Sequence, residues 1–348
     1  MSSSLVRAAR LGIPALAILV PLALALVLSA SAQAAPGKKQ KRARALVELR
    51  VEGPGKTLDP GTWYVLGSGH ERIRRSRPSD ACRHGKGRIA LPRKTPLGLV
   101  QAASSFNRAL RQVWVRQDEA GFFVCEIGSV RGRPFTHPDG FAGWTYYVNG
   151  VFGSAAADQV RLDKGDRVLW LYNDFGSAPL NTGPRLELRG VPAGTTERTI
   201  EVQVIATDFE GATTPASGAE IEGAESVDEL GDGRYRVQLA RGFSTLRAVR
   251  EADQSVPSAP VTVCSRPDPD ACPAAHGRAI FGSSGGDRIS GTRGWDRIRA
   301  GGGRDRINLR GGGKDRVNCG GGRDVVLIKR GDRDDRIARN CERVIRTR

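Results

Sequence analysis

The sequence predicts a multidomain, mainly β protein that consists of a small α+β domain, a β-sandwich and a C-terminal parallel solenoid. Three observations support this fold class. Apolar and polar residues alternate in short runs, which is the period of β-strands. Turn residues separate these runs, and 44 glycines occur among the 348 residues. Near the C-terminus, aspartates recur at an almost constant interval, which is typical of a repeat fold.

The N-terminus has the composition of a signal peptide, which we assign to residues 1–34. Two arginines precede the apolar run 11–28, and the small residues of SASAQA follow it, as a cleavage site requires. The run is also long enough for an uncleaved membrane anchor, which is the alternative. Two prolines inside the run favour cleavage. Residues 35–45 then read as a basic linker, so we expect a secreted protein with no transmembrane segment after cleavage.

An even number of cysteines in an exported protein predicts disulfides. The six are Cys82, Cys125, Cys264, Cys272, Cys319 and Cys341. They allow many connectivities. Pairing in sequence order, 82–125, 264–272 and 319–341, is the simplest, because each bridge then lies inside one predicted domain. No C-x-x-C spacing occurs, which argues against zinc or redox chemistry.

Residues 46–176 are predicted to form the α+β domain. Apolar alternation starts at Leu46. Thr95 at the N-cap and Pro96 at the first helical position predict a helix over 95–110. Asn149-Gly150 between two apolar runs is typical of a tight hairpin turn.

The stretch GWTYYVNGVFG (143–153), followed by KGDRVLW, resembles the transcobalamin-like C-terminal domain, a family of unknown function common in exported bacterial proteins. The resemblance covers about 46–175 and implies a β-grasp-like fold with a ligand surface. It implies that a small, corrinoid-like molecule would contact Trp144, Tyr146, Tyr147 and Asn149. The alternative is that these aromatic residues pack in the core or along the hairpin.

Residues 182–264 contain further alternating runs with turns, which predict a β-sandwich. The spacing of Asp232, Gly233, Leu239 and Gly242 resembles the immunoglobulin-like and prealbumin-like repeats of exported bacterial proteins. The resemblance implies a spacer without chemistry of its own. The proline-rich residues 265–277 read as a linker.

Residues 278–348 carry the most regular pattern. Their aspartates follow one another at steps of 9, 9, 10 and 9: Asp287, Asp296, Asp305, Asp315 and Asp324. A β-branched aliphatic residue stands two positions after each aspartate. Each turn would be a short strand and a glycine-rich bend, with the aliphatic side chains stacked into a narrow core.

This pattern resembles the nonapeptide of hemolysin-type, or RTX, repeats, which form a calcium-binding β-roll. The resemblance implies that Ca²⁺ lies between turns, held by aspartate carboxylates and backbone carbonyls. Ca²⁺ is a hard cation that takes oxygen ligands, so the chemistry agrees. Besides the five aspartates, the implied bend residues are Gly301, Gly303, Gly311, Gly313, Gly320 and Gly322. The Cys319–Cys341 bridge would cap the solenoid.

Arginine directly follows four of the five aspartates, as Arg288, Arg297, Arg306 and Arg316. If these side chains point outward, calcium binding survives with reduced affinity. If they fold over the carboxylates, Asp–Arg ladders replace the ion. Residues 332–335 hold three more aspartates, for which we weigh a terminal cation site against salt bridges to nearby arginines.

The net charge is +17, and residues 276–348 hold 17 Arg and 2 Lys against 8 Asp and 1 Glu, which is +10. This excess favours an anionic partner such as a cell-wall or extracellular polymer, although a solvated basic surface would also explain it. No specific nucleic acid is expected. Residues 282–286 match G-x-S-x-G but lie in a repeat bend, and the four histidines are scattered, so we expect no enzyme.

The leading hypothesis is therefore a secreted, non-enzymatic modular protein that binds calcium through degenerate repeats and is associated with a surface or matrix. The first alternative is a small-molecule-binding accessory protein. The second is a calcium-independent protein that binds anions or the cell wall.

Overall fold

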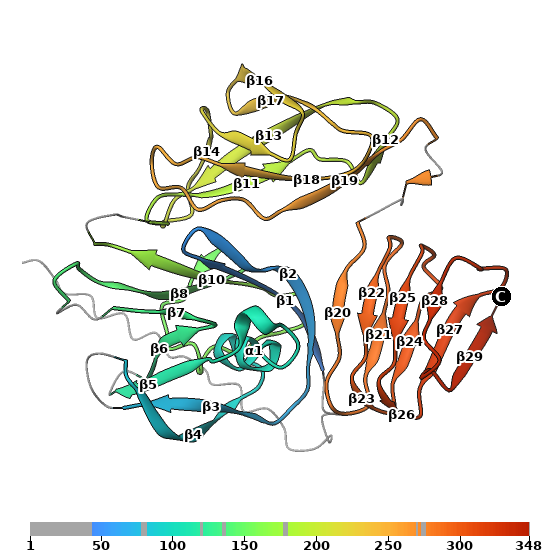
Figure 1. The fold of residues 1–348 in the computed structure, drawn as a ribbon, viewed down its shortest axis with the longest axis horizontal. Coiled ribbons are helices and arrows are strands. Elements are labelled where there is room, and N and C mark those ends of the chain that lie inside the picture. The colour runs from blue at the N-terminus through green and yellow to red at the C-terminus, as the bar shows by residue number, and fades with distance from the viewer. Residues whose placement is uncertain are drawn as a thin grey trace, which may run out of the picture. The chain divides into compact units, whose positions relative to one another are not determined.

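The computed structural model describes residues 44–77, 82–118, 121–133, 137–176, 180–268, 271–272 and 276–347. The predicted signal peptide and most of the basic linker lie outside these residues. The described chain is mainly β, with one α-helix, α1 (Pro96–Ala103), and one 3-10 turn, η1 (Arg108–Leu110) (Figure 1). No helix in the described part of the chain is long and apolar enough to cross a membrane.

Residues 44–176 form two sheets around one core that also takes up α1. In β1 (Ala45–Gly53), Val47, Leu49 and Val51 are fully buried, because strand alternation points them to the same side. The first sheet contains β2 (Lys56–Leu66), β1 (Ala45–Gly53), β10 (Arg167–Asp174), β8 (Ala142–Val148) and β9 (Val151–Phe152), in that order. The second contains β4 (His84–Pro92), β3 (His70–Ser76), β5 (Trp114–Asp118), β6 (Gly121–Ile127) and β7 (Val130–Arg131).

Local signals in this region are confirmed, but one boundary differs. Thr95 caps α1, and its Oγ1 accepts a hydrogen bond from the backbone N–H of Gly98 at 3.0 Å. Asn149 and Gly150 have φ values of +52° and +82° and turn β8 into β9. The helix predicted over 95–110 ends at Ala103, because Asn107 is extended and its side-chain amide donates to Leu58 O of β2 at 2.9 Å.

Residues 180–268 contain two mostly antiparallel sheets that share a second core. One sheet contains β11 (Arg185–Arg189), β13 (Thr199–Thr207), β17 (Arg234–Gln238) and β16 (Ser226–Gly231), with β14 (Thr213–Pro215) paired to β13. The other contains β12 (Gly194–Thr195), β19 (Val261–Ser265), β18 (Gly242–Val249) and β15 (Glu220–Glu222). The paired strands follow the alternating runs of the sequence, with β16 an additional strand that the runs did not indicate.

From Ala279 onward the strands alternate between two parallel sheets, and every step along one sheet spans 18 to 20 residues (Figure 1). One sheet contains β20 (Ala279–Phe281), β22 (Arg297–Arg299), β25 (Arg316–Asn318) and β28 (Arg336–Ile337). The other contains β21 (Arg288–Ser290), β24 (Arg306–Asn308), β27 (Val325–Lys329) and β29 (Arg343–Thr347). We call residues 278–347 the coil region. Two short strands, β23 (Gly302–Gly303) and β26 (Gly321–Gly322), pair within its bends. The central aliphatic residue of each strand faces a narrow core.

The coil region continues a sheet of the first domain. Strand β20 pairs in parallel with β2, with Trp63 opposite Ile280 and Tyr64 opposite Phe281. The result is one nine-stranded sheet that runs from β28 to β9. Trp63 and Val65 of β2 also join the core of the coil. The three predicted disulfides are confirmed, since Cys82–Cys125, Cys264–Cys272 and Cys319–Cys341 are bonded.

Candidate metal centre

Acidic residues stand directly before the strands of the coil region and stack in two columns. Column 1 consists of Asp287, Asp305, Asp324 and Glu342, which precede β21, β24, β27 and β29. Column 2 consists of Asp296, Asp315 and Asp335, which precede β22, β25 and β28. All five aspartates named from the sequence are at most 2 % exposed. Parallel pairing therefore brings together carboxylates that lie two repeats apart in the sequence.

After the first carboxylate of column 1, one oxygen of each carboxylate accepts a hydrogen bond from the backbone of the preceding coil. The N–H of Asp287 donates to Asp305 Oδ1 at 2.6 Å, and that of Asp305 donates to Asp324 Oδ1 at 2.8 Å. In column 2, the N–H of Asp296 donates to Asp315 Oδ1 at 2.9 Å. The N–H of Asp315 donates to Asp335 Oδ1 at 3.0 Å. These bonds orient the carboxylates along each column.

The second oxygen divides the repeats into two groups. Ser283 Oγ donates to Asp287 Oδ2 at 3.0 Å, and Thr292 Oγ1 donates to Asp296 Oδ2 at 3.2 Å, so the first two carboxylates are satisfied by hydroxyls. In contrast, the second oxygens of four carboxylates in the two columns are buried and have no hydrogen-bond partner among the described residues. They are the Oδ2 atoms of Asp305, Asp315, Asp324 and Asp335. A buried oxygen without a partner is costly and calls for a ligand.

The glycine-rich bends of successive coils stack closely on one another. A methyl group built on Gly320 would lie 1.7 Å from Gly301 O, and one on Gly322 would lie 1.6 Å from Gly303 O. Both residues have positive φ, at +88° and +140°, so glycine is required there for two reasons. Methyl groups on Gly301, Gly303, Gly311 and Gly313 would likewise fall on backbone atoms of the previous coil. All six predicted glycines therefore lie in tightly stacked bends.

The carboxylates are held at a high electrostatic cost. Burial and the neighbouring Asp324 raise the pKa of Asp305 to about 7. Burial, with Asp296 and Asp335 nearby, also raises the pKa of Asp315 to about 7, although the N–H of Asp296 opposes the shift. The pKa of Asp335 is raised as well, chiefly by burial. The structure thus places like charges together, which a cation would offset.

The arginines that follow the aspartates point away from the columns. Arg288, Arg297, Arg306 and Arg316 are exposed, and none forms an ion pair within the described part of the chain. The proposed Asp–Arg ladder is therefore not the arrangement in the structure. A more distant arginine fills the first position of column 1. Arg44 forms an ion pair with Asp287 and donates to Gly285 O at 2.9 Å.

The donor set matches the preferences of a hard cation. Carboxylate and carbonyl oxygens suit Ca²⁺, whereas zinc sites use cysteine and histidine. Among the described residues, no group of three or more His, Cys, Asp and Glu side chains could hold a metal. A site in either column would therefore combine two carboxylates from successive coils with backbone oxygens of the bends. Asp335, which we weigh from the sequence for a terminal cation site, completes column 2, although it lies outside the regular spacing of the five aspartates.

The aromatic residues of the predicted ligand surface are buried. Trp144 and Tyr146 belong to the core of residues 44–176, and Tyr147 packs on Leu171 in a smaller cluster. Trp144 Nε1 donates to Val130 O at 3.2 Å, and Tyr146 Oη donates to Ala155 O at 2.6 Å.

Asn149 belongs to the hairpin and not to a cavity. Its Oδ1 accepts from the N–H of Arg167, and its Nδ2 donates to Asp166 Oδ1, each at 2.9 Å. These contacts fix the β8–β9 turn against the start of β10.

Residues 104–174 match the family described as Domain of unknown function (DUF4430). DUF4430 is a transcobalamin-like family, which confirms this part of the resemblance. The DUF4430 region begins just after α1 and ends with the last residue of β10. It includes the β8–β9 hairpin and leaves out β1 to β4. No curated protein matches the chain.

Proposed function

We propose that the coil region is a calcium-binding β-roll of RTX type in a secreted, non-enzymatic protein. One Ca²⁺ would be held between Asp305 and Asp324 in column 1, and another between Asp315 and Asp335 in column 2. The four buried carboxylate oxygens without a partner carry this proposal. When bound, calcium supplies the positive charge and the missing contacts at these oxygens.

The contacts of Asp287 and Asp296 explain why the first two repeats would bind calcium more weakly. Asp287 and Asp296 already accept hydrogen bonds from Ser283 and Thr292 on their second oxygen. Arg44 adds a cation at Asp287. An ion at either position would have to displace these groups, whereas it would displace none at Asp305 or Asp315.

The two domains that precede the coil region are consistent with a non-enzymatic protein. We propose that residues 46–176 form a β-grasp-like domain and residues 182–264 an immunoglobulin-like spacer. Three disulfides favour an exported protein. The small-molecule alternative has less support, because Trp144 and Tyr146 are buried with their polar atoms bonded within the chain.

Calcium titration of variants that keep the side-chain shape tests the proposal. Asp305→Asn and Asp315→Asn each retain an oxygen for the backbone N–H but remove the charge. We expect each variant to lose one ion by calorimetry, and to unfold at a higher temperature than the natural chain in EGTA, since a buried unpaired charge is gone. The corresponding gain in unfolding free energy should be about 1–3 kcal/mol.

Asp296→Asn is the matched control, because Thr292 already bonds this carboxylate. It should keep both ions and change the unfolding temperature in EGTA much less. If the natural chain binds no calcium, or if Asp296→Asn lowers the stoichiometry as much as Asp315→Asn does, the assignment of the two sites is wrong.

A further inference from the structure

Arginines form a continuous row on the outer face of one sheet of the coil region. Arg297 lies directly opposite Arg316, and Arg316 lies directly opposite Arg336. All three are exposed, because they flank the buried Ile298 and Val317 and the partly buried Ile337 along their strands. Neighbouring strands are about 4.8 Å apart, so the backbones that carry the three arginines follow one another at about this interval. We call these three residues the arginine row.

The row is not neutralised by the protein. Like charges directly opposite one another on paired strands destabilise a sheet. Elsewhere in the chain arginines have acidic partners, as Arg133 has Asp174 and Arg93 has Glu71. Within the described residues, no member of the arginine row forms an ion pair. An anion that bridges the row would remove the repulsion.

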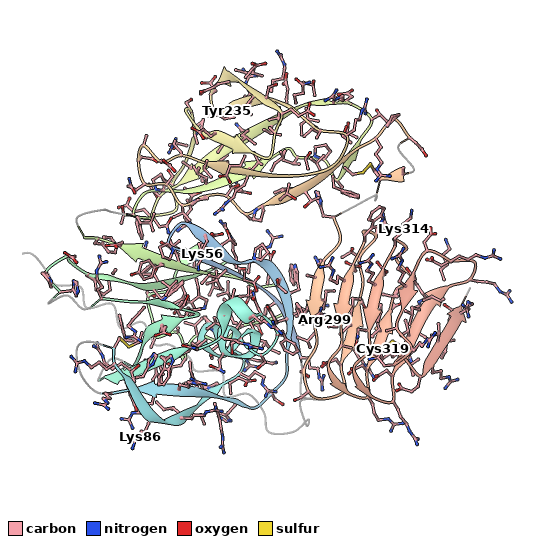
Figure 2. All side chains as sticks on the ribbon, in the orientation of Figure 1. Lys56, Lys86, Tyr235, Arg299, Lys314 and Cys319 are labelled. Atoms are coloured by element: carbon pink, nitrogen blue, oxygen red, sulfur yellow. A yellow bond between two sulfur atoms is a disulfide. The ribbon has the colours of Figure 1, made fainter. Side chains whose placement is uncertain are left out.

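The surroundings of the row form a recognition surface. The row lines a shallow groove of about 570 Å³ together with Arg299 and Asn318. Arg299, labelled in Figure 2, lies over the ring of Phe281 at 5.7 Å, which orients its guanidinium. Asn318 is fixed by a hydrogen bond from Asn340 Nδ2 at 2.9 Å.

The other sheet lacks this arrangement. It begins a comparable row with Arg288 and Arg306, but Val325 interrupts it. The uninterrupted row therefore occurs on one face of the coil region, whereas on the other Arg288, Arg306 and Arg310 line a smaller hollow of about 320 Å³.

We propose that the groove binds an acidic polysaccharide whose chain crosses the strands. Guanidinium groups pair bidentately with carboxylate and sulfate, and the Asn318 amide suits a sugar hydroxyl. Single-stranded nucleic acids are usually bound on aromatic platforms, and no aromatic ring lines this groove. A membrane surface would require exposed apolar anchors, whereas Ile298 and Val317 are buried. The proposal does not depend on calcium, because the row lies on strands and the carboxylate columns lie at the bends.

Binding of a fluorescent heparin oligosaccharide to the full chain, at saturating calcium, tests the proposal. The triple variant Arg297→Gln, Arg316→Gln, Arg336→Gln should bind about tenfold to a hundredfold more weakly, since three exposed ion pairs are lost. A second triple, Arg293→Gln, Arg330→Gln, Arg339→Gln, removes the same charge from exposed positions outside the row. It should bind within about threefold of the natural chain. Circular dichroism must show that both triples are folded; if the first is not, Arg316→Lys serves in its place and should also weaken binding, because lysine cannot bind bidentately.

Equal losses in the two triples would overturn the proposal, because net charge alone would then explain binding. Tighter binding to oligo(dT) of equal charge, or to phosphatidylglycerol vesicles, than to the oligosaccharide would overturn it in favour of a nucleic acid or a lipid surface. A chain that binds the oligosaccharide but no calcium would refute the proposed ion sites and leave the row intact, so the two proposals can fail separately.

Discussion

Ser283 and Thr292 differ from the residues at the same place in the later repeats. Each stands four residues before its aspartate and bonds that carboxylate through its hydroxyl. Asp305, Asp315 and Asp324 have Gly301, Gly311 and Gly320 at this place, so no side chain reaches their second oxygen. The residue four positions before the aspartate thus decides whether a carboxylate is satisfied by the protein or left for a cation.

The raised pKa values predict that the stability of the ion-free coil region falls as the pH rises, whereas its calcium affinity increases. The pKa values of Asp305 and Asp315 rise from 3.8 to about 7 on folding. Their contribution to ion-free stability is therefore greatest below about pH 4 and is lost as the pH rises to about 7. Calcium binding requires ionised carboxylates, so we expect calcium affinity to increase over the same range.

Thermal unfolding in EGTA and calcium titration over about pH 5 to 8 would measure both trends. In the double variant Asp305→Asn, Asp315→Asn, the unfolding temperature in EGTA should depend much less on pH. Ion-free stability that increases over this range would contradict the assignment of the shifts to these carboxylates.

Elements governed by local chemistry could be predicted from the sequence, and those governed by distant contacts could not. Thr95 and Asn149 set a helix start and a hairpin through their own neighbours. The helix end depends on a bond from Asn107 to β2, which lies about fifty residues away in the sequence. Residues 159–162 alternate like a strand but do not form one, and the next strand, β10, begins only at Arg167. In the candidate metal centre, the aspartate period predicted the repeat and the candidate ligands, whereas their burial and the unpartnered oxygens depend on stacking between coils.

The Cys319–Cys341 bridge is expected to stabilise the end of the coil region. It closes a segment with a sequence separation of 22 and joins two residues of the coil core (Figure 2). The variant Cys319→Ser, Cys341→Ser should lose about 3 kcal/mol of unfolding free energy, which denaturant titration would measure. The Cys264–Cys272 bridge closes a much shorter loop, so the Cys264→Ser, Cys272→Ser variant should lose less unfolding free energy. Equal losses would show that loop closure is not the source of the stabilisation.

At the scale of the whole molecule, the main feature without a sequence signal is the pairing of β20 with β2. The two strands are more than two hundred residues apart, and the apolar residues at the contact, Trp63 and Tyr64 opposite Ile280 and Phe281, are ordinary for strands. The pairing covers an edge that the coil region would otherwise expose, which protects it from pairing with other chains. Repeat folds need such caps, and here a neighbouring domain supplies one.

Because the sheet is continuous, calcium should stabilise the first domain as well as the coil region. With free calcium at about a hundred times Kd, one coupled site would add about 2.7 kcal/mol to the unfolding free energy. We expect slower amide hydrogen exchange in β1 and β2 when calcium is added. Strands β16 and β17 belong to another sheet and serve as the control. Protection confined to the coil region would show that the two parts unfold independently.

The disulfide near the C-terminus also has a mechanical consequence. If the C-terminus were held by a partner and the chain pulled, β29 would peel away first, since it is the last strand of its sheet. Tension would then pass through the sulfur atoms directly from Cys341 to Cys319. Residues 320–340 would carry no load, and they include Asp324 and Asp335, one carboxylate of each column. A chain arranged this way would yield a few residues under force and keep the bends of residues 320–340 unstretched.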